Sequence, residues 1–350
     1  MSTTRRDVKW LALLGVLLLA AVASALTVWS VKESPWEVLK ILFDASFGSV
    51  DSVSMTLFYA TPLLLTGAAV LLPYRAGLFN IGAEGQLYMG AVCAMAWGLF
   101  YSGPGGPLAW GGGIIAAALG GGAWGLLAGW LKVKRGVHEV IATIMLNFIA
   151  MAFSNWMILY PFKNPETQGS ETRWIAEALR IPRVFQNLPW SFPLALVIAL
   201  TAVAAIRWTW WGYRVRACGE NPGAARVAGI SVNGTLLSSM FFGGALAGLV
   251  GFHEVFCSSY RLIDGFSPQF GFTGIAIALM CRGSLPGFIA ATVFFAALHK
   301  GTLELDMETE NITRDLSSII QALLLIAIAM GPALERAIAT RLAKKEARRG

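Results

Sequence analysis

The chain has 350 residues, of which 56% are hydrophobic and only 13% charged, and its mean hydropathy is +0.62. Soluble domains carry about 25% charged residues, so this composition excludes an ordinary water-soluble enzyme or binding module. The net charge of +7 does not indicate a nucleic-acid partner, because the Lys and Arg residues gather at the ends of apolar segments. We therefore expect one all-α domain, embedded in membrane lipid, over residues 1–350.

The first apolar run follows a basic N-terminal segment. Arg5, Arg6 and Lys9 precede a run that ends near Ala25, which resembles a secretory signal with its cleavage site. Because many further apolar segments follow, we expect residues 1–30 to form an uncleaved first transmembrane helix, held by cytoplasmic charges.

Apolar stretches of about 20 residues, the length needed to cross ~30 Å of hydrocarbon, recur along the whole chain. About ten spans with both termini in the cytoplasm place the basic connections inside, and they place the acidic connection at 304–310 outside. Two short apolar stretches flank Arg282 and predict a broken or re-entrant pair. The chain then ends in a basic cytoplasmic tail over 335–350. The predicted spans are 10–30, 53–73, 79–101, 108–131, 139–161, 191–210, 234–257, 271–281, 286–300 and 316–334.

Glycine accounts for 38 residues, many of them in runs. Small residues allow the close backbone approach that holds a membrane bundle together, so the runs at 111–113, 120–122 and 243–244 are interpreted as packing surfaces. No Gly-Lys-Ser or Gly-Lys-Thr occurs in the sequence, so we expect no ATPase site of the Walker type. A small-residue helix, a connection and a Gly-Phe or Gly-Leu-Phe segment recur near 60–95 and 240–280. The predicted topology gives these two segments opposite orientations, which indicates inverted repeats with a solute path between them.

Polar residues first interrupt the apolar pattern at 77–87. Asn80 and Glu84 are four residues apart, so on one helix they would share a face, with Gln86 close by. An ionised Glu at mid-bilayer costs about 2.5–3.5 kcal/mol and is normally shielded, paired or functional. Two compatible interpretations follow: these side chains border a solute path, or Asn80 caps a helix whose first turn contains Glu84.

A second polar pattern begins at 138–150. Glu139, Thr143 and Asn147 repeat at four-residue spacing, and Ser154 lies two turns further along, so they form one narrow polar stripe. In lipid this stripe must face protein or water. We expect it to border the solute path, with hydrogen bonding between helices as the alternative.

Metal chemistry is not expected from these residues. The His138-Glu139 pair does not belong to a His-Glu-x-x-His zinc motif, because residue 142 is Ala. The four Cys residues are dispersed and show no Cys-x-x-Cys spacing, so we expect neither a metal site nor a disulfide framework.

The third candidate segment is the basic connection at 212–230, called the coupling segment below. We expect a short helix from about Pro222 to Gly229, with a polar side and an Ala-rich side, able to seat in a groove of a soluble partner. An ordinary charged loop is the alternative. The candidate contact residues are Arg214, Arg216, Gly219, Glu220, Asn221, Pro222, Ala224, Ala225 and Gly229.

The coupling segment resembles the coupling loop of binding-protein-dependent ABC importers. The family pattern Glu-Ala-Ala, three residues, Gly is similar to Ala224-Ala225 followed by Gly229, with Gly223 in the place of the Glu and Glu220 nearby. The segments 77–87, 138–150 and 271–279 resemble permeases of nucleoside and simple-sugar importers, a branch of the branched-chain amino acid and ribose permease class. The resemblance extends from about Leu57 to Ala333.

This resemblance implies an ABC importer permease fold with short or broken helices, in the bacterial inner membrane, and a transporter subunit rather than an enzyme. It implies three protein partners in addition to membrane lipid: a cytoplasmic subunit that binds and uses ATP, a second related permease in a heterodimer, and an extracytoplasmic substrate-binding lipoprotein. No cofactor is expected in the chain itself.

The sequence specifies the solute less closely than it specifies the class of transporter. A polar but uncharged path favours a nucleoside, whereas a ribose-like sugar and riboflavin are alternatives. A proton-coupled secondary transporter that uses Glu84 or Glu139 is a reading from a different class. A membrane-bound enzyme is more distant, because no nucleophile, base and metal set converges in the sequence.

Overall fold

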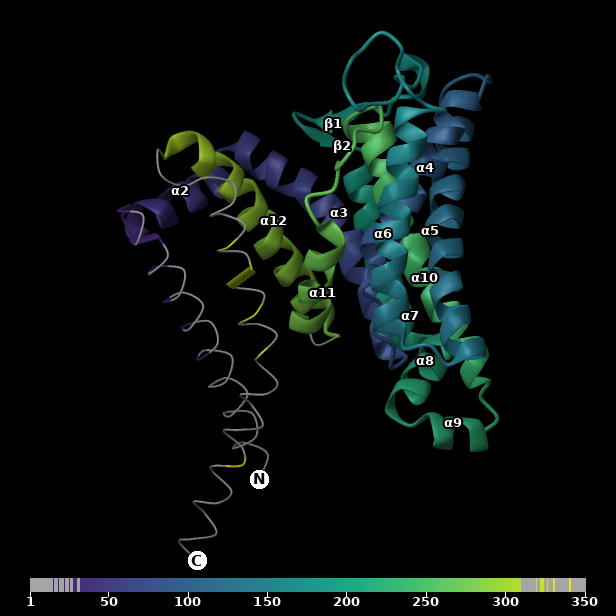
Figure 1. Ribbon diagram of the computed structural model, residues 1–350. Coiled ribbons are helices and arrows are strands. Elements are labelled where there is room, and N and C mark those ends of the chain that lie inside the picture. Colours follow the sequence, from purple (N-terminus) through teal and green to yellow (C-terminus); the bar gives the residue numbers. More distant parts are fainter. Residues whose placement is uncertain are drawn as a thin grey trace, which may run out of the picture. The chain divides into compact units, whose positions relative to one another are not determined.

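The computed structural model describes residues 32–281 and 283–309, together with single helical residues in the flanking segments. The described elements are helices apart from two short strands that form one hairpin, which agrees with the predicted helical fold (Figure 1). The spans predicted at the two ends of the chain and the basic tail lie largely outside the described residues, and Arg282 lies wholly outside them. The total of ten spans therefore stays a prediction.

The described elements follow the predicted order along the chain. Six helices are long and apolar enough to cross a membrane by length and composition, namely α3, α5, α6, α7, α10 with the turn that follows it, and α12. α4 falls outside this set, since it begins with polar residues. The elements are α2 (Pro35–Phe47), α3 (Val50–Arg75), α4 (Ala83–Phe100), α5 (Pro107–Arg135), α6 (Glu139–Leu159), η1 (Glu177–Leu179), β1 (Arg183–Phe185), β2 (Leu188–Pro189), α7 (Ser191–Trp208), α8 (Trp210–Glu220), α9 (Pro222–Val227), α10 (Val232–His253), the π turn η2 (Glu254–Ser258), α11 (Phe270–Met280) and α12 (Leu285–Glu308).

The chain divides into two compact units. The smaller unit consists of the described residues of Met1–Val53 and Ala297–Gly350, and the larger unit is Ser54–Ala296. All candidate site residues belong to the larger unit.

The helices α4, α5 and α10 form the centre of the larger unit (Figure 1). Their backbones touch at glycines: a Cβ added to Gly121 would lie 2.3 Å from the Gly244 carbonyl oxygen, and one added to Gly90 would lie 2.3 Å from Gly248 Cα. Only residues without a side chain permit this approach. The predicted packing role of the runs 120–122 and 243–244 is therefore confirmed.

The C-terminal end of α10 widens into the π turn η2, and the chain then continues as an irregular segment to α11. The long connection between α6 and α7, which contains η1, β1 and β2, is tied to this segment. Arg261 Nη1 lies 2.8 Å from Glu171 Oε2, and the Arg261 guanidinium lies 4.2 Å from the centroid of the Trp174 ring. An ion pair and a cation–π contact on the same guanidinium fix this loop to the end of α10.

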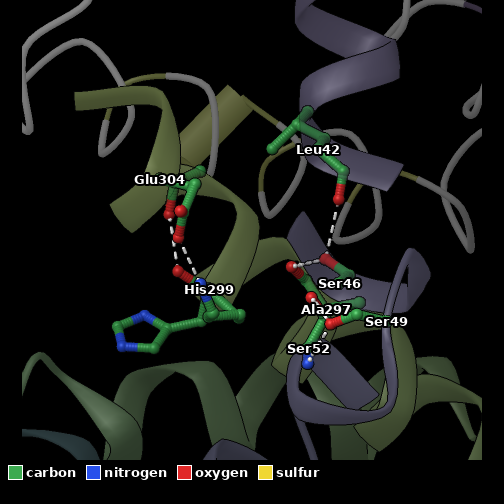
Figure 2. A network of polar contacts seen from close by, with 9 residues as sticks. Leu42, Ser46, Ser49, Ser52, Ala297, His299 and Glu304 are labelled. Atoms are coloured by element: carbon green, nitrogen blue, oxygen red, sulfur yellow. Dashed lines mark hydrogen bonds and ion pairs between the residues drawn. The ribbon is translucent and has the colours of Figure 1, made fainter. Parts of the chain in front are cut away.

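In the smaller unit, α2 packs against the C-terminal part of α12. The Ser46 hydroxyl lies within hydrogen-bonding distance of two carbonyl oxygens, 2.7 Å from that of Leu42 and 2.7 Å from that of Ala297, as Figure 2 shows. The predicted spans leave 31–52 unassigned, so α2 was not anticipated. Its signal is Pro35 at the first helical position, after Ser34.

The two helices that flank Arg282 differ from the prediction in length. α11 is short, with 11 residues, as expected for one half of a broken pair. α12 has 24 residues and continues to Glu308. The prediction that the acidic residues from Glu304 onward form a loop is therefore wrong for Glu304 to Glu308. An ion pair between Lys300 and Glu304, one turn apart, supports this extension.

Candidate functional site

The N-terminal ends of α4 and α11 meet inside the larger unit. The Gly271 N–H donates to Glu84 Oε2 at 2.7 Å, and a Cβ added to Gly271 would lie 2.4 Å from Glu84 N. The Ser267 hydroxyl also bonds to the Glu84 carboxyl, and Glu84 is only 3% exposed. The first N–H groups of a helix lack partners within the helix, and a carboxylate at this position accepts from them. Glu84 thus joins two helix starts.

An amide pair holds the turn that leads into α4. Asn80 Nδ2 donates to Gln86 Oε1 at 3.0 Å, and Gln86 Nε2 donates to Asn80 Oδ1 at 3.0 Å. Asn80 Oδ1 also accepts from the Gly82 N–H at 3.1 Å. Each amide therefore supplies the other with one donor and one acceptor in a buried setting, which fixes the turn.

This geometry corrects one detail of the prediction. Asn80 lies before α4, not on it, so a helical face shared by Asn80 and Glu84 is wrong, because the chain turns before the helix begins. The alternative interpretation holds for Glu84, which lies in the first turn of α4, although Gly82 rather than Asn80 occupies the capping position.

Asn147 of α6 binds the same turn. Asn147 Oδ1 accepts from the Gly85 N–H at 2.8 Å, and Asn147 Nδ2 donates to the Ile81 carbonyl at 3.0 Å. The side chain is buried, and both of its polar atoms serve the backbone of a neighbouring segment. This is the interhelical hydrogen bonding that the sequence left as the alternative for the stripe on α6.

The other stripe residues have different surroundings. Thr143 Oγ1 donates to the Glu139 carbonyl of its own helix at 2.8 Å, and Glu139 Oε2 lies 2.8 Å from Lys132 Nζ of α5. Ser154 Oγ is buried and has no hydrogen-bond partner among the described residues. Thr143 packs beside Asn147 near the start of α4, whereas Ser154 lies about two turns away. That the stripe borders a solute path stays a prediction.

Replacing Asn147 by leucine is expected to destabilise the protein by about 2–3 kcal/mol, because it leaves the Gly85 N–H and the Ile81 carbonyl buried without their partners. The measurement is the thermal unfolding midpoint of the purified chain in detergent. Ser154→Ala is the matched control on the same helix face, since it removes a buried hydroxyl that has no partner in the described part of the chain. Equal midpoints for the two variants would contradict the assigned role of Asn147.

The coupling segment forms two helices, α8 and α9, at the end of the larger unit opposite β1 and β2 (Figure 1). Asn221 Oδ1 accepts from the Ala224 N–H at 3.0 Å and caps α9, with Pro222 at the first helical position. The predicted short helix at Pro222 is therefore present. The residues before it were expected in a loop but lie on α8, namely Arg214, Arg216, Gly219 and Glu220.

The coupling segment is packed directly against the bundle. A Cβ added to Gly219 would lie 2.2 Å from the carbonyl oxygen of Arg75, at the end of α3. Cys218 and Ala225 form one apolar cluster with residues at the start of α10. Ala225 therefore faces the bundle, whereas Val227 is 92% exposed. The exposed surface of the coupling segment consists of the outer side of α9 together with residues of α8 such as Arg214 and Glu220.

The sequence did not identify Gly271 as a contact of Glu84. It belongs to the Gly-Phe segment that was noted as half of an internal repeat and as part of the family resemblance, without a role for Gly271 itself. The repeat itself was the available signal: the turn before α4 and the start of α11 both contain glycine next to an aromatic or polar residue, and the structure brings the two together.

Comparison with known proteins identifies relatives along most of the chain. Residues 52–329 match a family described as the permease component of the branched-chain amino acid transport system. The guanosine ABC transporter permease protein NupP of Bacillus subtilis is 34% identical over 316 residues, which are 87% of this chain and 88% of that protein. The glucose ABC transporter permease protein TsgB13 of Haloferax volcanii is 33% identical, over 83% of this chain and 80% of its own. The nucleoside ABC transporter permease protein NupB of Lactococcus lactis is 30% identical, over 83% and 82%.

Proposed function

Because the chain belongs to the family of permease components of the branched-chain amino acid transport system, we propose that it is the membrane-spanning subunit of an ATP-driven importer for a nucleoside-like solute. The observation that carries the proposal is the similarity, along more than four fifths of the chain, to two permeases named for guanosine and for nucleosides. Six apolar helices agree with a multi-pass membrane protein. The nucleoside is the part of the proposal that needs a direct test.

The importer that we propose has further subunits. A cytoplasmic ATP-binding subunit hydrolyses ATP, a second related permease completes the membrane part as a heterodimer, and an extracytoplasmic lipoprotein delivers the solute. This chain contributes no ATPase site and no cofactor. In the bacterial inner membrane, both of its termini and the coupling segment would face the cytoplasm, where the positive-inside rule places basic connections.

A continuous set of contacts supports a route from the ATP-binding subunit to the solute path. Gly219 of the coupling segment touches the end of α3 at Arg75, the following turn contains Asn80, and α4 then begins with Glu84 against α11. Because only the end of α3 lies between the coupling segment and the turn that contains Asn80, a movement of α8 and α9 would displace this turn. A solute can drive such a switch only if it binds the two states differently.

The meeting of α4 and α11 also supports the proposed inverted repeats. One helix pair, α3 and α4, and a second, α10 and α11, each contain an interruption, and their second helices touch at Glu84 and Gly271. Helix interruptions that meet at a repeat interface are a recurrent plan of solute sites in transporters. We propose that the path passes this junction, bordered by Asn80, Gln86 and the stripe on α6.

The solute is tested with the complete importer in proteoliposomes, with labelled guanosine as the probe. Uptake should require ATP and should be competed by unlabelled nucleosides, but not by equal concentrations of glucose or riboflavin. Competition by glucose alone would replace the nucleoside by a sugar, a second candidate favoured by the 33% identity to the glucose permease. Uptake that persists without ATP and collapses with a protonophore would instead establish a secondary transporter.

Gly229 tests the coupling segment. Its φ is +78°, a conformation that glycine and asparagine adopt far more readily than β-branched residues, and no atom lies within 4 Å of a Cβ added there. Gly229→Val should lower solute-stimulated ATP hydrolysis by the assembled importer about tenfold, whereas Gly229→Asn, of similar size, should retain most of it. Unchanged coupling in the valine variant would dismiss the assigned task of this segment.

A further inference from the structure

Three arginines from different elements line one cavity at the end of the larger unit that contains α8 and α9. The cavity has a volume of about 230 Å³, and it is lined by Arg75 of α3, Arg207 of α7, Arg216 of α8, Gly283 and aliphatic side chains. Among the described residues that line it, none is acidic. The described wall of this pocket, called the arginine pocket below, therefore contributes three positive charges and no negative one.

Part of this charge has a local explanation. Arg216 donates to the carbonyl oxygens of Ile206 and, at 3.1 Å, of Arg207, and so it satisfies backbone groups at the end of α7. A guanidinium has five N–H donors, so these two bonds leave donors on Arg216 for another acceptor. The end of a helix also favours a cation near its free carbonyls, which explains Arg75 in the last turn of α3 and Arg207 in the last turn of α7. It does not explain why three arginines converge on one cavity.

Gly283 shapes the pocket. Its φ is +75°, and a Cβ added to it would lie 1.4 Å from Arg75 Nη2. Only glycine at this position lets the Arg75 guanidinium lie directly against the backbone of the turn before α12. The position of one of the three charges therefore depends on a residue that carries no charge itself.

We propose that the arginine pocket binds a phosphate-bearing anion, supplied either by the headgroup of an anionic lipid or as free phosphate. Guanidinium groups match the oxygens of a phosphate with paired hydrogen bonds. Basic pockets between membrane helices on the cytoplasmic side are suited to anionic headgroups, and the aliphatic part of the wall suits the first methylene groups of the attached acyl chains. An anion here links α3, α7 and α8 in one contact.

The location gives the bound anion a consequence for the coupling segment. Arg216 belongs to α8, and Gly219, one turn further on, touches the end of α3 at Arg75. A phosphate held between Arg75, Arg207 and Arg216 would neutralise their mutual repulsion and hold α8 against the bundle. The anion would therefore stabilise the segment through which we propose that ATP hydrolysis is transmitted, although its binding does not depend on the identity of the solute.

The test is the thermal unfolding midpoint of the purified full-length chain in neutral detergent, with phosphatidylglycerol, phosphatidylcholine or inorganic phosphate added. Phosphatidylglycerol should raise the midpoint by about 2–4 °C more than phosphatidylcholine does. Arg207→Gln, which removes an exposed charge, and Gly283→Ala, which keeps all three charges but displaces Arg75, should each lose more than half of this shift. Arg135→Gln, at the end of α5 and outside the pocket, is the matched control and should keep it.

The arms of the experiment separate the two sources. If millimolar inorganic phosphate reproduces the shift with the same dependence on Arg207 and Gly283, the ligand is a soluble phosphate; if only phosphatidylglycerol does, it is a lipid headgroup. The proposal would be overturned if the Arg207→Gln and Gly283→Ala variants showed a shift of the midpoint as large as that of the Arg135→Gln control. Because no transport is measured, this result is independent of whether the importer carries a nucleoside.

Discussion

Replacing Gly121 by alanine is expected to destabilise the protein by about 1–3 kcal/mol and to lower its yield in the membrane. The added methyl group would lie 2.3 Å from the carbonyl oxygen of Gly244 and 2.7 Å from Gly248 Cα. Both neighbours are backbone atoms of α10, so no side chain can move aside, and the two helices must separate instead. The thermal unfolding midpoint in detergent and the amount of folded protein recovered from membranes measure the effect.

Gly111→Ala is the matched control, because it adds the same methyl group to the same helix, α5. No atom lies within 4 Å of a Cβ at Gly111, and alanine is a better helix former than glycine by about 1 kcal/mol. This variant should be as stable as the unsubstituted chain or more so. Equal losses in the two variants would mean that the helices at the centre of the larger unit are not in backbone contact.

Replacing Glu84 by leucine is expected to reduce ATP-driven uptake by the assembled importer at least tenfold. The substitution leaves the Gly271 N–H without its acceptor in a buried setting, at a cost of about 1–3 kcal/mol, and it removes the link between α4 and α11. If this cost destabilises the state that is competent for transport, each ~1.4 kcal/mol lowers the population of that state, and with it the rate of uptake, about tenfold. Initial rates of uptake, divided by the amount of folded permease, are the measurement.

Glu84→Gln separates the hydrogen bond from the charge. Glutamine keeps a side-chain oxygen that can accept from the Gly271 N–H, so uptake should stay within about twofold to threefold of the unsubstituted importer if the helix junction is what matters. A loss in the glutamine variant as severe as in the leucine variant would show that ionisation of Glu84 is required, and it would favour proton coupling at this residue.

The bounds of a helix could be predicted closely from the sequence where a long apolar run alone determines them. The segment predicted at 139–161 forms α6 at Glu139–Leu159, and the one at 108–131 forms α5 at Pro107–Arg135, because long apolar runs between charged or Pro-containing ends have one solution in lipid. Prediction failed for α2 and for the end of α12. Both are amphipathic or charged stretches, and they pack against each other, as Val38 of α2 does against Leu305 of α12.

The candidate site was predicted in its residue types but not in its pairings. Asn147, Glu84 and Gln86 stood out because polar groups are expensive in an apolar chain, and all three are buried in the structure. Asn147 and Glu84 bond to backbone groups, for example the N–H of Gly85 and of Gly271. A backbone N–H is present at nearly every residue, so the sequence carries no mark of which one is used, and only the fold selects it.

The π turn at Glu254–Ser258 changes the rotation of the chain about the helix axis at the C-terminal end of α10. Such a turn contains one residue more than a turn of ordinary helix, and each residue corresponds to about 100° around the axis. If this extra residue were absorbed or deleted, the segment that follows would swing around the axis while the helix would become hardly shorter. The direction in which Arg261 reaches Glu171, and with it the attachment of the long connection between α6 and α7, thus depends on this one additional residue.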